Sequence, residues 1–399
     1  MPPCANANRG AAQAAESDLR SAPLWKGAKP AARLCEEFSR LFGVPHVFLL
    51  SSGKAALTIA LEALGTLSER REVIIPAFSS FCLPSAVVRA GMKVRLCDIL
   101  PDTLDFDLKR LREALTDQTL CVIPVHLFGL ISQVDKIAKL ARERGAFVLE
   151  DAAQAAGGRL QGPPVGTIGD IGIFSLGRGK NMTASAGGVI VTHSDTMADT
   201  IARRIQAQGL ERPGAGCSAW LKAAALTVFL HPRLYWLPEQ IPSLNLGVSE
   251  FDPCFDVAPF SRLQAGLGRS SLRRLDEYNQ IRRVHAQQLE RAVEGTPGLN
   301  LPQALANSTP VYLRFPILVE DPERREAVYA ALAYQHLGVS KTYPSALNGI
   351  RELMPCTVRN ESAYPGAETV AQQILTLPTH PFVLQSDLGR VAALIRASR

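Results

Sequence analysis

The tetrapeptide Ser51-Ser52-Gly53-Lys54 has the residue types of an anion-binding turn. It follows the apolar run His46–Leu50 and leads into the helical pattern of residues 55–65. Where a strand, a tight glycine turn and a helix N-terminus follow one another, backbone N–H groups and the helix dipole point at one spot. Lys54 adds a full positive charge there. The turn predicts a phosphate site, although an ordinary turn with an exposed lysine has the same pattern.

An acidic residue, Asp151, stands where the apolar run 146–150 ends, in the segment EDAAQ (150–154). A carboxylate at a buried strand end is costly unless a cation pairs with it. A protonated pyridinium nitrogen is such a cation. The alternative is that Asp151 caps the following helix, as aspartate does at many strand–helix junctions.

A lysine, Lys180, ends the segment FSLGRGK (174–180), ahead of the apolar run 188–192. Its small neighbours leave room for a bulky adduct, and the alternative is an exposed loop lysine. A phosphate cradle, an acid for a ring nitrogen and a nearby lysine are what pyridoxal 5'-phosphate (PLP) requires. The lysine bonds covalently to PLP, and the acid keeps the ring nitrogen protonated so that the ring withdraws electrons.

Apolar runs alternate with helical patterns between residues 44 and 192. The runs are mostly continuous, which is typical of strands covered on both faces. Their alternation with helices predicts a doubly wound, mostly parallel α/β sheet of seven strands, with ligands beyond the strands' carboxyl ends. The predicted strands are His46–Leu50, Glu72–Pro76, Lys93–Asp98, Leu120–Val125, Ala146–Glu150, Ile171–Ser175 and Gly188–Thr192.

The pattern changes after residue 255. We predict a flexible N-terminal tail (1–28), a large PLP-binding domain (29–255) and a smaller C-terminal α+β domain (256–399). Within these, Gly65 and Gly145 are expected to end helices. One long helix is expected over 262–293.

The composition is that of an ordinary globular protein of 399 residues, 47% hydrophobic and 20% charged, which excludes disorder for most of the chain. The net charge of +6 has no lysine or arginine block behind it, so we expect no nucleic-acid partner. The absence of a CxxC pair predicts no metal site, and Cys82, Cys97 and Cys121 are expected as small core residues. The N-terminal residues lack a secretory pattern, which favours the cytoplasm.

The chain resembles the DegT/DnrJ/EryC1/StrS family of PLP-dependent sugar aminotransferases, which share the aspartate-aminotransferase fold (PLP fold type I). The likeness covers roughly residues 30–399. It is carried by SSGKAALTIALEALG (51–65), VIIPAFSSFCLPSAVVRAG (73–91), VIPVHLFG (122–129), VLEDAAQAAGG (148–158), VGTIGDIGIFSL (165–176) with the lysine and GGVIVT after it, and TLPTHP (376–381).

The resemblance implies a role for each matching residue. Lys180 is implied as the Schiff-base lysine and proton shuttle, and Asp151 as the partner of the ring nitrogen. Gln154 is expected against the ring or its hydroxyl group. The residues implied for PLP binding are Gly53, Lys54, Asp151, Gln154, Ser175 and Lys180.

The implied activity is transfer of an amino group from an amino acid, expected to be glutamate, to a keto-sugar, expected to be nucleotide-linked, in polysaccharide or secondary-metabolite biosynthesis. Family members place the active site at a dimer interface, so a homodimer is expected. The alternatives are a dehydratase, an aminotransferase for a lipid-linked or non-sugar acceptor, and a PLP-binding sensor. Lys180 argues against the dehydratase branch, which has histidine there. A sensor would need an output module.

The sequence departs from the family pattern at the phosphate site. Lys54 replaces the usual threonine, and Gly177 replaces a histidine, so that Arg178 either takes over a polar function or is solvated. Val257 and Pro259 stand where an asparagine and an arginine normally occur, and that asparagine reaches the phosphate of the neighbouring subunit. We hypothesise that the charge of Lys54 compensates for this lost contact.

The roles of two further positions near the expected site are not assigned. Ser80 stands where many family members stack an aromatic side chain on PLP, with Phe78 and Phe81 beside it, so the stacking residue is not assigned. His126 lies at a strand end, either as a core histidine or as a site residue.

Residues 218–247 form an apolar insertion, longer than the family's usual connection. Its apolar run is far shorter than the roughly 20 residues that span a bilayer. Trp220, Tyr235 and Trp236 flank the run, and such residues with Arg233 suit a membrane interface. We therefore consider two roles: a dimer or lid element, or peripheral membrane contact through 218–242 that captures an apolar acceptor.

Overall fold

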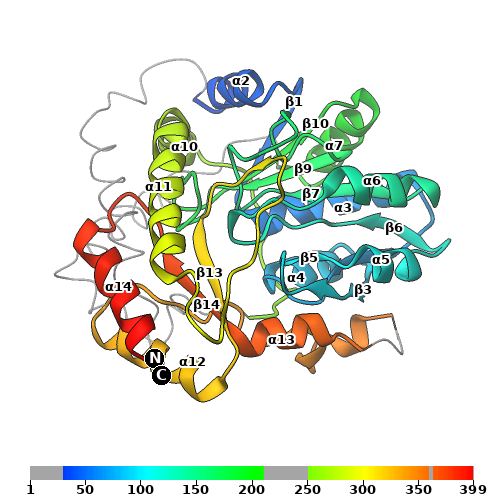
Figure 1. Cartoon of the computed structure of the whole chain (residues 1–399). Coiled ribbons are helices and arrows are strands. Elements are labelled where there is room, and N and C mark those ends of the chain that lie inside the picture. Colours follow the sequence, from blue (N-terminus) through cyan, green and yellow to red (C-terminus); the bar gives the residue numbers. More distant parts are fainter. Residues whose placement is uncertain (1–29, 211–249, 359–362, 399) are drawn as a thin grey trace.

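The computed structural model describes residues 30–210, 250–358 and 363–398. Its largest element is the predicted seven-stranded sheet (Figure 1). Only β10 runs against the other six strands, because β10 is antiparallel to both its neighbours. In spatial order the strands are β1 (His46–Leu50), β10 (Gly188–Thr192), β9 (Ile171–Ser175), β7 (Phe147–Asp151), β6 (Thr119–Val122), β2 (Glu72–Pro76) and β3 (Lys93–Cys97).

Helices cover both faces of this sheet. One apolar core joins it to α3 (Gly53–Leu67), α4 (Cys82–Arg89) and α7 (Asp195–Ala207). A second core on the opposite face joins it to α2 (Pro30–Phe42), α5 (Leu108–Ala114) and α6 (Val134–Glu143). Strand side chains divide between the cores by alternation: Ile75 belongs to the first core and Ile74 to the second. The sheet is therefore doubly wound, as predicted.

The predicted helix ends have mixed outcomes. Gly145 follows α6 with a φ of +61°, the left-handed conformation that glycine favours after a helix. The prediction for Gly65 is wrong, because α3 continues through it to Leu67. A Cβ atom at Gly65 would lie 2.5 Å from Cε of Met92. Glycine at this position permits close packing within the helix instead of ending it.

A three-stranded antiparallel sheet forms beside the large one, with α11 running along it (Figure 1). Its strands are β11 (Leu299–Asn300), β13 (Arg314–Val319) and β14 (Ile374–Pro378), and the helices of this half are α10 (Arg262–Arg273), α11 (Leu275–Val293), α12 (Pro322–Tyr334) and α14 (Gln385–Ala397). The single helix expected over 262–293 is two helices, because the backbone leaves the helical conformation at Arg274, which has ψ of 2°.

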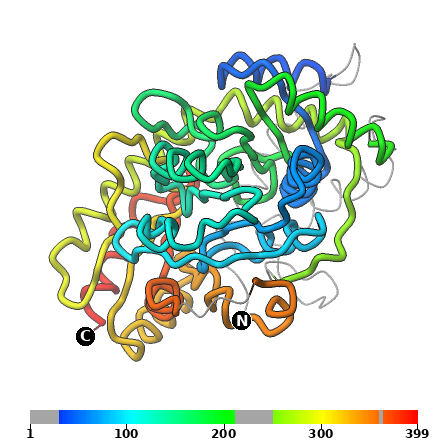
Figure 2. Tube along the Cα trace, turned by 90° about the vertical axis from the view of Figure 1, so that its right-hand side faces the viewer, coloured from blue at the N-terminus to red at the C-terminus, as the bar shows by residue number. Residues whose placement is uncertain are grey.

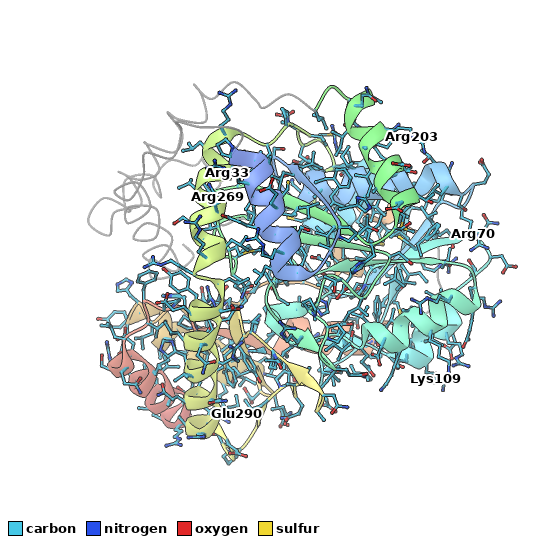
Figure 3. The ribbon with its side chains drawn as sticks, turned by 90° about the horizontal axis from the view of Figure 1, so that it is seen from above. Arg33, Arg70, Lys109, Arg203, Arg269 and Glu290 are labelled. Carbon is cyan, nitrogen blue, oxygen red and sulfur yellow. The ribbon has the colours of Figure 1, made fainter. Side chains whose placement is uncertain are left out.

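Chain segments far apart in the sequence hold the two halves together. Figure 3 shows α2 beside α10, where Arg269 forms an ion pair with Glu37 at 2.7 Å. Figures 1 and 2 show α13 (Pro365–Gln373) below the β3 edge of the large sheet. There the Asp98 carboxylate accepts the backbone N–H groups of Gly366 and Ala367. The domain boundary at 255/256 stays a prediction, because the first core continues into α13.

Two short strand pairs complete the strands of the described residues. They are β4 (Ile99–Leu100) with β5 (Asp105–Phe106), and β8 (Arg159–Leu160) with β12 (Ser308–Thr309). In the described residues, we find no helix long and apolar enough to cross a membrane. The N-terminal tail and the apolar insertion at 218–247 lie outside those residues.

Candidate active site

The predicted phosphate turn lies where β1 meets α3. Ser52 caps α3, since its hydroxyl oxygen accepts the Ala55 N–H at 3.1 Å. Gly53 approaches the end of β9 so closely that a Cβ atom on it would lie 3.2 Å from Oγ of Ser175. The Ser175 hydroxyl in turn accepts the Gly177 N–H at 3.2 Å. A helix N-terminus, two glycines and a hydroxyl group thus converge, a combination suited to a phosphate group.

Lys54 belongs to this turn, but its side chain is held by the segment that leads towards α10. Its Nζ lies 4.3 Å from the ring centroid of Phe255 and 4.0 Å from Oδ2 of Asp252. Hydrogen bonds in both directions between Ser51 and Ala258 fasten the same segment to the turn. The structure therefore assigns Lys54 a contact that the sequence did not predict. Compensation for the missing asparagine stays a hypothesis.

Glu150 and Asp151 are consecutive on β7, so their side chains point to opposite faces of the sheet. The two carboxylates have different hydrogen-bond partners, and their pKa values shift in opposite directions. Glu150 is fully buried and accepts hydrogen bonds from His126 Nε2 at 2.9 Å and from the backbone of Gly166, Ile168 and Gly169. Burial alone would raise the pKa of Glu150, yet the His126 side chain and the backbone donors outweigh it and lower the pKa. Both carboxylate oxygens of Glu150 are therefore occupied by protein donors, which indicates a structural role.

Asp151 carries the second carboxylate on β7. Its Oδ1 accepts the Ala153 N–H at 2.9 Å. Burial raises the pKa of Asp151, against the opposing effects of that hydrogen bond and of the charge on Lys180. A carboxylate that gains from nearby positive charge is suited to a protonated ring nitrogen.

Lys180 lies in the loop that follows β9, and its Cγ is 4.0 Å from the position of a Cβ on Gly177. Burial lowers the pKa of the Lys180 amine, and the charges of Asp151 and Cys82 act in the opposite direction. A lowered pKa favours the neutral amine, which is the nucleophilic form. Arg178, in the same loop, is exposed.

Gln154 is buried and joins this site to the segment between α12 and α13. Its Oε1 accepts the Phe128 N–H at 3.1 Å, and its Nε2 donates to the Tyr343 hydroxyl at 3.3 Å. Tyr343 comes from the segment between α12 and α13, far along the chain. The Ser80 side chain acts to lower the pKa of Tyr343, against the larger effect of burial.

Two residues at the site escaped the sequence analysis. Cys82 is half-buried at the start of α4, near enough to Lys180 and Tyr343 that a negative charge on its sulfur would raise the pKa of both. The expectation that it is a core residue is wrong, whereas Cys97 and Cys121 are buried as expected. The position of Cys82 just beyond the carboxyl end of β2 was an available signal. Tyr343 offered none, because it is remote from every site motif.

His126 is fully buried, as the core assignment expected. Ser132 N–H donates to its Nδ1 at 3.0 Å, so Nε2 carries the proton that is donated to Glu150. In the described ranges 30–210, 250–358 and 363–398, no cluster of histidine, cysteine and acidic residues is arranged to hold a metal ion.

These residues fit PLP. Gly53 and Ser175 leave room for a phosphate at a helix N-terminus, since a Cβ on Gly53 would crowd the serine hydroxyl. Asp151 offers a buried carboxylate to a ring nitrogen, and Lys180 offers an amine with a lowered pKa. A doubly wound sheet with one reversed strand and this set of groups defines a PLP enzyme of fold type I.

The chain belongs to the DegT/DnrJ/EryC1/StrS aminotransferase family, whose model matches residues 8–396. It is a PLP-dependent aminotransferase of that family. It is 30% identical over 360 residues to a UDP-N-acetyl-3-dehydro-α-D-glucosamine 3-aminotransferase of Acidithiobacillus ferrooxidans, covering 90% of this chain and 86% of the relative. It is 28% identical over 371 residues to a dTDP-4-dehydro-2,3,6-trideoxy-D-glucose 4-aminotransferase of Saccharopolyspora spinosa, covering 92% and 89%.

Solved structures share the fold. DesV of S. venezuelae, in complex with a ketimine intermediate, superimposes with a TM-score of 0.76 at 24% identity. The match covers 97% of this chain and 94% of DesV.

Proposed function

We propose that the protein transfers an amino group from glutamate to a nucleotide-linked keto-sugar, in the synthesis of a polysaccharide or secondary metabolite. The observation that carries this proposal is the convergence of Asp151, Lys180 and the Gly53–Ser175 cradle at one edge of the large sheet. The named activities of both curated relatives, on a UDP-linked and a dTDP-linked sugar, support the class of acceptor.

When bound, PLP supplies an electron-withdrawing ring that lets an amino group leave one carbon and join another. The residues of the chain provide the rest. The N-terminus of α3, Gly53 and Ser175 orient the phosphate. Asp151 would hold a negative charge beside the ring nitrogen, and Gln154 would lie against the ring or its hydroxyl group.

With PLP bound, the Nζ of Lys180 would accept and return the proton that moves during amino transfer. Burial favours its neutral amine, which accepts a proton, and the nearby charge of Asp151 stabilises the ammonium that results. A buried amine of lowered pKa is therefore suited both to covalent bonding with PLP and to the later proton transfers.

We further propose that the enzyme works in the cytoplasm as a homodimer, with residues 218–242 making peripheral membrane contact. The aromatic residues Trp220, Tyr235 and Trp236 in the sequence support this contact. The test is liposome co-sedimentation of the full chain and of a variant lacking 218–242. Equal recovery of the two in the supernatant refutes membrane contact.

The experiment that tests the catalytic proposal starts from the purified enzyme with PLP. We expect glutamate to discharge the visible absorption of bound PLP, and a keto-sugar to restore it. UDP-, dTDP- and GDP-linked keto-sugars are compared with free and lipid-linked ones, and products are weighed by mass spectrometry. A product that has lost oxygen without gaining nitrogen identifies a dehydratase. PLP binding without any turnover across the panel favours a sensor.

A further inference from the structure

Four aromatic side chains gather beside the Asp151 end of β7. The ring centroid of Tyr343 lies 5.8 Å from Phe78, 6.5 Å from Phe81 and 6.0 Å from Phe128, and it is nearly parallel to Phe128 at 22°. Phe78 and Phe128 are each 1% exposed and Phe81 is 8% exposed, whereas Tyr343 keeps an intermediate exposure. Among the four, Tyr343 is therefore the ring that can offer a surface to a ligand.

The hydroxyl group of Tyr343 fixes this ring relative to the reacting groups. It accepts a hydrogen bond from Gln154 Nε2 at 3.3 Å, and the Ser80 side chain acts on its pKa from nearby. Burial is the largest of the effects that raise its pKa, and the charges of Cys82 and Asp151 add to it. The phenol therefore stays neutral and keeps its hydrogen bond, within the electrostatic reach of Asp151.

The backbone of Tyr343 has a φ of +61°, in the left-handed region. A bulky residue rarely adopts this conformation, and it keeps it where surrounding contacts impose it. Pro344 follows and narrows the backbone choices of Tyr343 further. The fold thus maintains a strained residue in order to place one aromatic ring beside Gln154.

Ser80 provides the room for that ring. It lies between β2 and α4, next to Phe81, and its side chain is too short to cover a cofactor ring. Its hydroxyl accepts the Cys82 N–H at 3.3 Å, and its side chain is near enough to Tyr343 to lower the pKa of the phenol. An aromatic residue at position 80 and the ring of Tyr343 would compete for one volume.

We propose that Tyr343 supplies the aromatic wall against the ring of PLP, carried into the site of the large sheet by the segment between α12 and α13. Bound PLP would then connect the two halves of the molecule. The inference rests on the proposed function only in placing PLP at Asp151 and Lys180. It concerns cofactor binding and does not depend on the acceptor.

The test compares Tyr343→Ala, Tyr343→Phe and the double variant Ser80→Phe with Tyr343→Ala. Equilibrium dialysis measures the PLP dissociation constant of each apo-protein, and circular dichroism at the visible PLP band reports the asymmetry around the ring. We expect Tyr343→Ala to weaken PLP binding roughly tenfold and to change the dichroic band. Tyr343→Phe stays within a few-fold of the parent, and the double variant regains most of the affinity.

Tyr312→Ala is the matched control, because Tyr312 is also a left-handed tyrosine at the small sheet but packs on Phe315 at 6.0 Å. Far-ultraviolet dichroism of each apo-protein verifies folding. The assignment is overturned if Tyr343→Ala binds PLP as the parent does, if Tyr312→Ala weakens it equally, or if the double variant binds no better than Tyr343→Ala. A failed keto-sugar panel would leave these measurements unchanged and would count only against the proposed function.

Discussion

The ring of His126 and the carboxylate of Glu150 form a fully buried pair, with Nε2 and Oε1 2.9 Å apart. The pair lies directly behind Asp151, on the other side of β7. Because three backbone N–H groups also point at Glu150, its charge is compensated within the loop 166–169. This loop leads into β9, the strand that ends at Ser175, so the pair supports the site without touching it.

Glu150→Gln should lower the free energy of unfolding by about 3 kcal/mol, because an amide group would face backbone donors with no acceptor for its own N–H groups. Urea unfolding of the apo-protein measures the loss. Exposed Glu143→Gln is the control and should change stability little.

The same pair predicts a pH dependence. The folded state lowers the pKa of Glu150, so its stabilisation is complete above the ordinary pKa of 4.5 and is lost as the pH falls through the lower folded value. Stability should therefore decline more steeply in the parent than in Glu150→Gln as the pH drops below about 4.5. Parallel curves for the two proteins would contradict this assignment.

Asp151→Asn should reduce amino transfer by roughly 100-fold or more, because the ring nitrogen would lose the charge that keeps it protonated. Rapid mixing with glutamate, followed at the PLP absorption band, isolates the affected half of the reaction. Removing the anion should also lower the pKa of Lys180 further, so the pH profile of PLP uptake by the apo-protein should move to lower pH. Asp102→Asn, at an exposed position, is the control. An unchanged pH profile would show that the charge of Asp151 does not act on the pKa of Lys180.

Lys180→Ala should abolish transfer and remove the linkage to PLP that borohydride fixes in the parent. Mass spectrometry after borohydride treatment reports the linkage directly, independently of turnover. A fixed PLP adduct on Lys180→Ala would show that another residue is the nucleophile. Lys136→Ala, remote from the site and exposed, should leave both properties intact.

Lys54→Thr tests whether charge at the phosphate turn matters. We expect several-fold weaker PLP binding, with the difference shrinking at high salt because electrostatic attraction is screened. Lys54→Met retains an apolar stem beside Phe255 and should weaken binding similarly if charge is the cause. Exposed Lys93→Thr is the control. Equal affinity of Lys54→Thr and the parent would end the compensation hypothesis.

The sequence predicted the strands well, since buried parallel strands are short continuous apolar runs. Four of the seven, including His46–Leu50 and Gly188–Thr192, have the predicted ends. Gly65 was misassigned because a glycine that ends a helix and one that allows close packing look alike in sequence. The close approach of Met92 to Gly65 distinguishes the two cases, and it is visible only in the structure.

The site was predictable where its residues follow strands and not where distant segments meet. Asp151, Lys180 and Gly53 each stand at a strand end, so the parallel sheet brings them to one edge. Tyr343 reaches the site by folding of the second half of the chain, and neither its spacing nor its neighbours indicate this. The contact of Lys54 with Phe255 has the same origin.

The reversed strand β10 has a consequence for how the molecule assembles. It lies between β1, the first strand of the chain, and β9 and pairs with both, so early and late parts of the chain are brought together in the sheet. Gly53 follows β1 and Ser175 ends β9. The phosphate cradle therefore forms only after β1 has joined β9 and β10, which lie far from it in the sequence. Bringing such distant segments together is a slow, non-local step of folding. PLP should therefore bind only after β1, β10 and β9 have paired. The rate at which a refolding chain binds PLP would then report the rate of this last pairing step.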